Sequence, residues 1–295
     1  MKLAVLGCGE VGRLVARAAA GRFEVALCDT FPSAAAALGA ELGAPWHAEI
    51  GDWLSEVDRV WACVTGDTAL VAASAAAARM RPGTVYVDLT TASPDDKRDA
   101  AENAAGYGVG YVDVAIMGTV ALTGIRTPLL LAGSDATRVA EEFAVAGAPA
   151  ARAMVGTAGD AIALKLLRTV ITKGVEALAV EAFVAAERRG VRAELRRILA
   201  DIDEQGFSPF LDAVVRTHVV HAERRMHEVD RAVAQLEDDG LPATVLRGVH
   251  GRFEQTVLAL RHLPPEPGTS DDVDRAIAWL HGALPAPAPA GTVGH

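Results

Sequence analysis

The first 155 residues alternate between two kinds of segment, and this alternation constrains the fold more than any other feature. Short apolar runs typical of buried strands occur at Lys2–Leu6, Phe23–Cys28, Val57–Val64, Thr84–Leu89, Val109–Ile116 and Leu129–Ala132. Alanine-rich stretches typical of helices lie between them, at Val11–Ala20, Ala34–Leu42, Thr68–Met80 and Asp95–Gly106. Strands that alternate with helices favour a parallel sheet covered on both faces. We therefore predict a doubly wound α/β domain over residues 1–155.

The strand pattern stops near Val155, and the remaining sequence is predicted to be helical. A long helical pattern runs over Thr157–Arg189 and ends at Gly190. Further helices are predicted at Ala193–Gln205, Phe210–Leu236, Ala243–Leu260 and Asp271–Leu284. The expected first domain covers residues 1–155. An all-α domain for substrate binding and dimerisation is expected over residues 156–284, and it includes the long helix 157–189. Residues 285–295 are expected to form a disordered tail.

Composition and charge exclude several classes of protein. The chain has 28 basic and 38 acidic residues and a net charge of −10, so it lacks the positive field on which nucleic-acid binding depends. No apolar stretch is long enough for a membrane span. The three cysteines, Cys8, Cys28 and Cys63, lie in or beside apolar runs, which favours buried, reduced thiols in a cytoplasmic protein. No cluster of cysteines or histidines in the first half has metal-ligand spacing, so we expect no metal.

A glycine pattern, G-x-G-x-x-G, occupies Gly7–Gly12. It follows the first predicted strand and opens the first predicted helix. Glycines at these positions allow a tight turn, close approach of the backbone to a pyrophosphate, and packing of the helix against the strand. The N–H groups at the start of the helix favour the phosphates. The residues predicted to bind the cofactor here are Gly7, Gly9, Glu10, Val11 and Gly12.

Asp29 ends the second predicted strand, where an acidic residue hydrogen-bonds the adenosine ribose of a dinucleotide. The residues that follow, Thr30–Pro32, include no arginine that could neutralise a 2′-phosphate. The pattern therefore predicts a Rossmann-type domain that binds NAD in preference to NADP. An alternative is that Asp29 only caps the next helix. Its carboxylate would repel a 2′-phosphate in either case.

Within the apolar segment Gly159–Glu176, polar residues recur every three or four positions and so share one helix face: Lys165, Arg168, Thr169, Thr172 and Glu176. Burial of a lysine side chain on a largely apolar helix costs desolvation free energy, so such a lysine usually has a charged or polar partner or a catalytic role. Burial and the charge of Arg168 would both lower the pKa of Lys165, as a lysine general base requires. The alternative is an exposed polar stripe in which Lys165 is solvated or pairs with an acid such as Asp160.

His218, His221 and Arg225 share one face of a predicted helix in the second half of the chain. One interpretation is that they contact an anionic substrate. The alternative is a polar helix surface or a subunit contact. A metal site at the two histidines lacks a third ligand at an obvious spacing.

The glycine loop, the segments Val87–Pro94 and Tyr111–Gly118, and the Lys165 helix occur in the order seen in β-hydroxyacid dehydrogenases. Over roughly its first 190 residues, the chain resembles this family, which includes 6-phosphogluconate and 3-hydroxyisobutyrate dehydrogenases. The segment His221–Glu228 is similar to part of an uncharacterised C-terminal domain found on a subset of these proteins.

The resemblance implies that Lys165 is the catalytic acid/base residue at the substrate hydroxyl. It also implies that Val64, Thr65 and the Thr90–Thr91 pair lie near the cofactor. The residues predicted to bind substrate, from the resemblance and from the helix faces, are Met117, Gly118, Thr119, Arg168, Thr169 and Arg225.

The chain departs from the family pattern at two sites. The family usually has a serine and two glycines where this chain has Met117–Thr119, and an asparagine where it has Arg168. A lysine–aspartate pair that the family carries on a late helix is not evident either. These departures put the family's usual small hydroxy acids in doubt as substrates.

We expect an NAD-dependent oxidoreductase in which Lys165 takes a proton from a substrate hydroxyl as hydride leaves the same carbon, or the reverse reaction. Arg168, with Thr119 and Arg225, would hold a carboxylate, phosphate or phosphonate group. An imine reductase is the alternative enzyme, although the lysine at position 165 argues against it. A non-catalytic NAD(H)-binding sensor is the alternative outside enzymes. The apolar surface of Leu164–Val184 predicts a homodimer formed through the helical domains.

Overall fold

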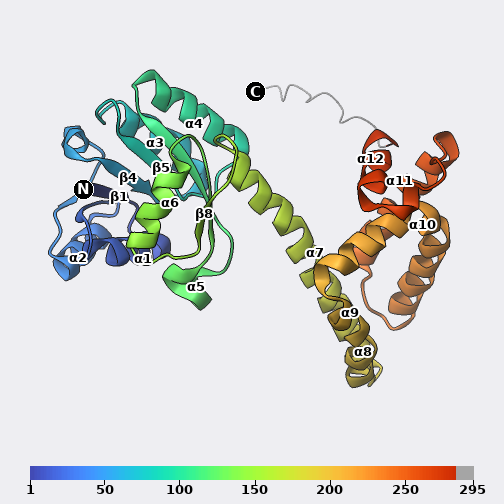
Figure 1. Cartoon of the computed structure of the whole chain (residues 1–295). Helices are drawn as coiled ribbons and strands as arrows, with labels where there is room; N and C mark the ends of the chain where they lie inside the picture. The colour runs from blue at the N-terminus through green and yellow to red at the C-terminus, as the bar shows by residue number, and fades with distance from the viewer. Residues whose placement is uncertain (284–295) are drawn as a thin grey trace, which may run out of the picture. The chain divides into compact units, whose positions relative to one another are not determined.

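The computed structural model of the protein describes residues 1–283 (Figure 1). The chain forms two compact units, Met1–Val170 and a second unit that begins at Ile171. The predicted tail, residues 285–295, lies outside the described residues. Among the helices of residues 1–283, none is long and apolar enough to cross a membrane.

The first unit is built on an eight-stranded sheet with the strand order β3-β2-β1-β4-β5-β6-β7-β8. Its strands are β1 (Lys2–Leu6), β2 (Glu24–Cys28), β3 (Trp46–His47), β4 (Arg59–Ala62), β5 (Val85–Asp88), β6 (Gly110–Ile116), β7 (Leu129–Ala132) and β8 (Ala151–Ala153). Every neighbouring pair is parallel except β6 and β7, which are antiparallel. The predicted doubly wound fold is confirmed. Because the strand order reverses beside β1, the loops after β1 and β4 meet at the carboxyl edge of the sheet.

Helices cover both faces of this sheet (Figure 1). They are α1 (Glu10–Ala20), α2 (Pro32–Leu42), α3 (Ala69–Ala77), α4 (Pro94–Gly106) and α6 (Ala136–Val145). The short helix α5 (Val120–Thr123) has no buried residue. One buried cluster includes Leu38 of α2 and Phe143 of α6, and a second includes Ala76 of α3 and Ala104 of α4. Successive strand side chains point to opposite faces and are buried on both, which explains why the strands are continuous apolar runs.

The predicted strands are all present, although several are shorter; β4 covers Arg59–Ala62 rather than Val57–Val64. The structure adds β3, β8 and α6, which the sequence pattern did not indicate. β3 has only two residues and β8 only three, one of them the exposed Arg152, so neither has a periodic apolar signal.

The long helix α7 (Asp160–Arg188) confirms the predicted helical segment after the sheet. It begins after Gly159, whose φ of +92° is in the left-handed region that favours glycine. The Asp160 carboxylate accepts a hydrogen bond from the N–H of Thr157 at 2.8 Å. Gly190, with φ of +71°, follows the last turn and ends the helix. The first turns of α7 belong to the first unit and the later turns to the second.

The second unit contains α8 (Arg192–Ile198), α9 (Ala200–Gln205), α10 (Phe207–Asp238), α11 (Thr244–His262) and α12 (Val273–Ala283). Glu181, on the part of α7 in this unit, accepts hydrogen bonds from the N–H groups of Val245 and Leu246 at the start of α11. The prediction of one helix over Ala193–Gln205 is wrong. The chain bends at Leu199, where ψ is −3°, and no glycine or proline marks that bend in the sequence.

Candidate cofactor and catalytic site

The glycine loop follows β1, and two of its glycines are required by close backbone packing. Gly7 has φ of +87°, and a Cβ there would lie 2.5 Å from the carbonyl oxygen of Cys63. A Cβ on Gly12 would lie 1.8 Å from the carbonyl oxygen of Gly7. These contacts hold the loop against the end of β4, as the motif predicts.

Gly9 differs from its two neighbours in the motif. Its φ is −73°, and an added Cβ would meet no protein atom within 4 Å. It is also the N-cap of α1 and offers no side-chain cap to the first-turn N–H groups, which include those of Glu10 and Val11. Open space beside uncapped N–H groups fits a pyrophosphate, so the loop suits the dinucleotide that the motif predicts.

Asp29 joins the glycine loop to the start of α2. One carboxylate oxygen accepts a hydrogen bond from the Cys8 N–H at 2.6 Å, and the other accepts one from the Phe31 N–H at 2.8 Å. The N-cap of α2 is Phe31, so Asp29 is not the helix cap that the alternative interpretation requires. Each oxygen keeps a further lone pair that can accept a ribose hydroxyl.

All three cysteines are free thiols; Cys8 and Cys28 are buried, but Cys63 is only partly so. Burial, with a smaller contribution from the Asp29 charge, raises the pKa of Cys8 to about 11. The thiol under the glycine loop is therefore protonated near neutral pH and is not a nucleophile.

The loops after β4 and β5 meet at the same sheet edge. A Cβ on Gly66 would lie 2.5 Å from the carbonyl oxygen of Thr91. The predicted cofactor residues Val64 and Thr65 precede Gly66, so the structure brings them next to the loop that holds Thr90. The Thr90 N–H donates to a carboxylate oxygen of Asp88 at 2.8 Å.

Lys165 reaches this edge from α7. Its Nζ donates a hydrogen bond to the Thr91 hydroxyl at 2.7 Å, and the side chain is partly exposed. Burial lowers the pKa of Lys165, the positive charge of Lys97 lowers it further, and the charge of Asp113 opposes both. The Lys97 charge comes from α4, an element that the sequence reasoning did not connect with Lys165. Asp160, the other suggested partner, instead accepts hydrogen bonds from Thr157.

A buried polar network that the sequence analysis missed lies below Lys165. Lys97 is 0% exposed, and its Nζ donates to a carboxylate oxygen of Asp113 at 2.7 Å and to the Asp88 carbonyl at 3.0 Å. The Tyr111 hydroxyl donates to the Asp88 carboxylate at 2.5 Å. The available signal was Asp113 itself, a charged residue in the middle of the apolar run over Val109–Ile116.

The predicted substrate loop lies between β6 and α5. The Met117 N–H donates to the Pro128 carbonyl at 2.8 Å, and its side chain packs on the cluster that contains Ala161 of α7. Thr119 is the N-cap of α5, and Gly118 beside it is exposed. The structure therefore brings this loop against the first turn of the helix that carries Lys165.

Two predicted substrate residues follow Lys165 on α7. The Thr169 hydroxyl donates to the Lys165 carbonyl at 2.9 Å, which is a bond within the helix. Arg168 is exposed and lies about one turn after Lys165 on the same side of the helix.

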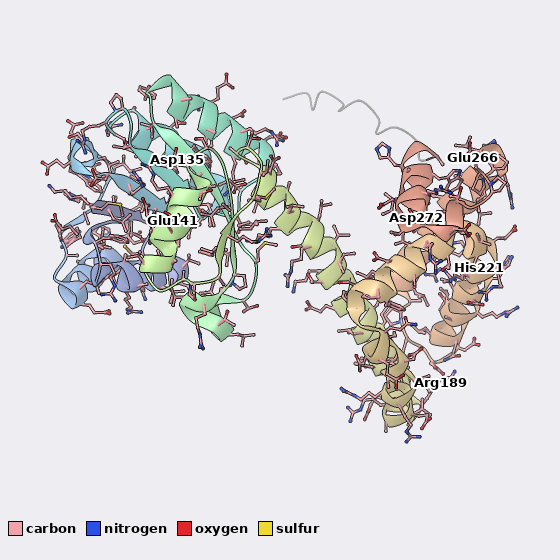
Figure 2. All side chains as sticks on the ribbon, viewed as in Figure 1. Asp135, Glu141, Arg189, His221, Glu266 and Asp272 are labelled. Atoms are coloured by element: carbon pink, nitrogen blue, oxygen red, sulfur yellow. The ribbon has the colours of Figure 1, made fainter. Side chains whose placement is uncertain are left out.

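Arg225, His218 and His221 lie on α10 in the second unit, where Figure 2 labels His221. Arg225 donates to the Thr217 hydroxyl at 2.9 Å, and the His218 ring bonds the Thr256 hydroxyl at 2.9 Å. Burial, and then the charges of two nearby arginines, lower the pKa of His218 to about 4, so its ring is neutral near pH 7. Contact of these residues with substrate stays a prediction. Within residues 1–283, no group of three metal-ligating side chains is placed to hold a metal ion.

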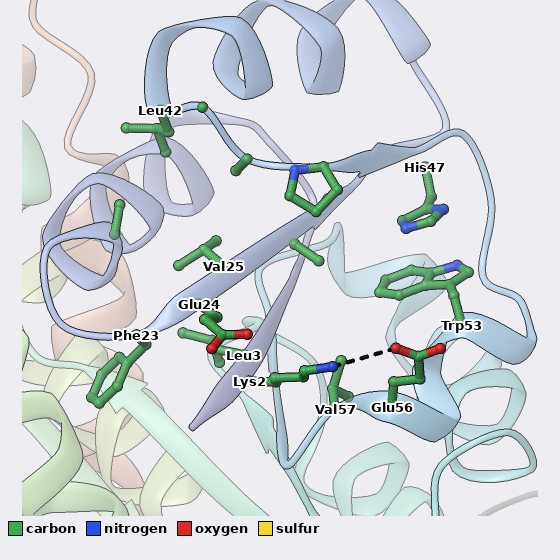
Figure 3. A pocket seen from close by; sticks show the side chains of 15 residues that line it. Lys2, Leu3, Phe23, Glu24, Val25, Leu42, His47, Trp53, Glu56 and Val57 are labelled. Atoms are coloured by element: carbon green, nitrogen blue, oxygen red, sulfur yellow. Dashed lines mark hydrogen bonds and ion pairs between the residues drawn. The ribbon is translucent and has the colours of Figure 1, made fainter.

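A pocket of about 570 Å³ lies elsewhere on the first unit (Figure 3). Lys2 and Glu24, the first residues of β1 and β2, line one part of it, and the stacked rings of His47 and Trp53 line another. Since the glycine loop follows the last residue of β1, most of this pocket is at the opposite end of the strands. It is therefore separate from the candidate cofactor site.

Two family models match this chain. Residues 2–159 match the NAD binding domain of 6-phosphogluconate dehydrogenase. Residues 186–256 match a domain of unknown function, DUF1932.

Similar solved structures include a conserved hypothetical protein of Sinorhizobium meliloti 1021, at 29% identity and a TM-score of 0.59 over 96% of this chain and 97% of that one. 3-Hydroxyisobutyrate dehydrogenase of Mycobacterium tuberculosis, solved with L-serine, has 25% identity and a TM-score of 0.59 over 68% of this chain and 70% of that one. An imine reductase of Aspergillus terreus has 21% identity and a TM-score of 0.71 over 88% of this chain and 94% of that one, which shows a shared fold.

Proposed function

Because this chain belongs to the family of the NAD binding domain of 6-phosphogluconate dehydrogenase, a family of NAD(P)-dependent oxidoreductases, we propose that it is an NAD-dependent dehydrogenase or reductase acting at a hydroxyl or carbonyl carbon. The proposed substrate is a small anion with a carboxylate, phosphate or phosphonate group. The observation that carries the proposal is the Lys165 amine, held 2.7 Å from the Thr91 hydroxyl where the loops after β4 and β5 meet.

Lys165 supplies the proton chemistry in this proposal. Burial and the Lys97 charge lower its pKa, so its neutral, proton-accepting form is more populated near pH 7 than that of a solvated lysine. The Thr91 hydroxyl orients the amine. In the oxidative direction Lys165 takes the proton of the substrate hydroxyl, and in the reductive direction it returns that proton to the carbonyl oxygen. The nicotinamide, when bound, accepts or supplies the hydride.

We assign the anionic end of the substrate to Arg168. A guanidinium binds a carboxylate or phosphate through paired, charge-assisted hydrogen bonds. Arg168 lies about one turn from Lys165, on the same side of α7, where the family pattern usually has an asparagine. Thr119, next to the packed Met117, supplies a second polar contact in this proposal.

The test is NADH formation from NAD, with NADP in parallel, across hydroxy acids that bear carboxylate, phosphate or phosphonate groups. Turnover of any member supports the dehydrogenase and identifies the anion. No turnover across the panel, with NADH still bound, would contradict this proposal and favour a non-catalytic NAD(H) sensor.

Reduction of a C=N bond is a second candidate function. The observation that favours it is the likeness in fold to the Aspergillus terreus imine reductase, at a TM-score of 0.71. Cyclic imines added to the panel with NADH and NADPH distinguish the two reactions. Imine-dependent oxidation of the reduced cofactor, without turnover of hydroxy acids, would favour this candidate.

We expect the wild-type protein to bind NADH more tightly than NADPH, because the Asp29 carboxylate at the end of β2 repels a 2′-phosphate. Asp29→Asn removes this charge but keeps an oxygen that can accept the Cys8 N–H. In the variant, the ratio of NADH affinity to NADPH affinity should fall by about tenfold, which corresponds to a change of roughly 1.4 kcal/mol in relative binding free energy. Fluorescence titrations of both reduced cofactors measure the ratio. The same ratio in both proteins would contradict a role for Asp29 in this choice.

We propose that the protein is a homodimer formed through α7. Large apolar side chains on this helix are exposed within one chain, including Leu167 at 63%, Val170 at 69% and Val180 at 59%. Exposed apolar surface of this kind is typical of protein interfaces. Light scattering should therefore give twice the 30.7 kDa mass of one chain. Val180→Asp should shift the mass towards the monomer, and a wild-type monomer would contradict the proposal.

A further inference from the structure

The buried Lys97–Asp113 pair is not used by the proton transfer described above. We propose that it is a positioning device for Lys165, in which Asp113 holds the start of α7 and Lys97 places a second ammonium charge beneath the acid/base residue. The inference rests on the proposed function only for its catalytic consequence, because its physical content can be measured without a substrate.

Asp113 connects the sheet to α7 through both carboxylate oxygens. One oxygen accepts from Lys97, and the other accepts from the N–H groups of Gly159 at 3.1 Å and Ile162 at 3.0 Å. Ile162 is one helical turn before Lys165, so these bonds fix the turn from which Lys165 projects. The N-terminus of a helix also interacts favourably with negative charge of the kind a carboxylate carries.

Lys97 has no contact with solvent. Asp113 at 2.7 Å and the Asp88 carboxylate at 3.7 Å surround its Nζ, and both are buried. A buried ion pair often adds little net stability compared with apolar residues of similar size. Stability alone is therefore a weak explanation for placing this charge under the Lys165 helix.

The two members of the pair act on Lys165 with opposite signs. Two charged groups from elements packed against α7 act on Lys165: Lys97 of α4 lowers its pKa, and Asp113 of β6 raises it. Arg168 lies about one turn away on α7 itself. Loss of the Lys97 charge should therefore raise the pKa of Lys165, and loss of the Asp113 charge should lower it. A purely structural role predicts no such reversal of sign.

The experiment is a pH titration of the ε-CH₂ signals of the full-length protein labelled with ¹³C-lysine. The chain has only four lysines, Lys2, Lys97, Lys165 and Lys173, so substitution of each in turn assigns the spectrum. Lys173 is an internal control because it is exposed on the same helix and pairs with Glu176. The two test variants are Lys97→Met and Asp113→Asn.

We expect the wild-type Lys165 signal to titrate below the ordinary value of a lysine side chain. Lys97→Met should raise the pKa of Lys165, and Asp113→Asn should lower it. A wild-type Lys165 that titrates at the ordinary lysine value, or shifts of the same sign in both variants, would overturn the inference. If Lys97→Met does not fold, the inference is tested by two remaining quantities: the pKa of Lys165 in the wild-type protein and its shift in Asp113→Asn.

Once a substrate is found, the pH profile of kcat gives a second readout. Lys97→Met should move the limb assigned to Lys165 to higher pH by the amount of the titration shift, with little change in NADH affinity. Shifts in the pKa of Lys165 without turnover of any substrate in the panel would support the inference and contradict the proposed enzyme. Failure of the inference and failure of the proposed function are therefore distinguishable.

Discussion

Lys165→Met is expected to lower kcat by about 10²- to 10⁴-fold, the usual contribution of a positioned acid–base group. Methionine keeps much of the apolar stem of lysine but has no proton to exchange. The affinity for NADH should change little, because the substitution leaves the glycine loop and Asp29, which carry the predicted contacts to the pyrophosphate and the ribose, in place. Steady-state kinetics on the best substrate of the panel and a fluorescence titration with NADH measure the two quantities.

Lys173→Met is the matched control for this prediction. Lys173 lies on the same helix, but it is exposed and pairs with Glu176. The control should keep the wild-type kcat. This result would show that loss of a positive charge elsewhere on α7 does not lower kcat, so the effect of Lys165→Met is specific to Lys165. If Lys165→Met turns over at the wild-type rate, another group carries the proton.

Gly9→Val should weaken NADH binding by about tenfold to a hundredfold, with only the small loss of stability that valine causes at a helix N-cap. The added side chain starts in open space, since a Cβ there meets no protein atom within 4 Å, and the φ of −73° suits any residue. The same space is where a pyrophosphate would approach the N–H groups of α1. Loss of one charge-assisted hydrogen bond costs about 1.5–3 kcal/mol, which corresponds to this range of affinity. A cofactor titration and a thermal melt measure the two effects.

Gly12→Ala is the contrasting variant from the same motif. Its Cβ would lie 1.8 Å from the Gly7 carbonyl oxygen, so α1 or the loop has to move. We expect a loss of about 1–3 kcal/mol in the free energy of unfolding. Unchanged NADH affinity in Gly9→Val would contradict a nucleotide site at this loop, and unchanged stability in Gly12→Ala would contradict the packing described for it.

The features predicted correctly from the sequence are local ones. The strand and helix segments of the first unit follow from side-chain periodicity over a few residues, and the turn at Gly7–Gly12 follows from the backbone freedom of glycine. The Lys165 helix was found in the same way, from polar residues at helical spacing in an apolar segment. Features without a local signal were missed, such as β3 with two residues and the bend at Leu199.

The amino-acid sequence by itself determined the α/β fold, the glycine loop, the acidic end of β2 and the helix that carries the lysine, because each depends on neighbours a few positions away. Only the tertiary structure decided what surrounds that lysine. Lys97 and Asp113 belong to different elements, α4 and β6, and come together through the packing of α4 against the sheet. Burial and the charge of Lys97, a residue far from Lys165 in the sequence, therefore lower the pKa of Lys165. Electrostatic interactions depend on distance through space and on burial, and neither quantity is encoded in the spacing of residues along the chain.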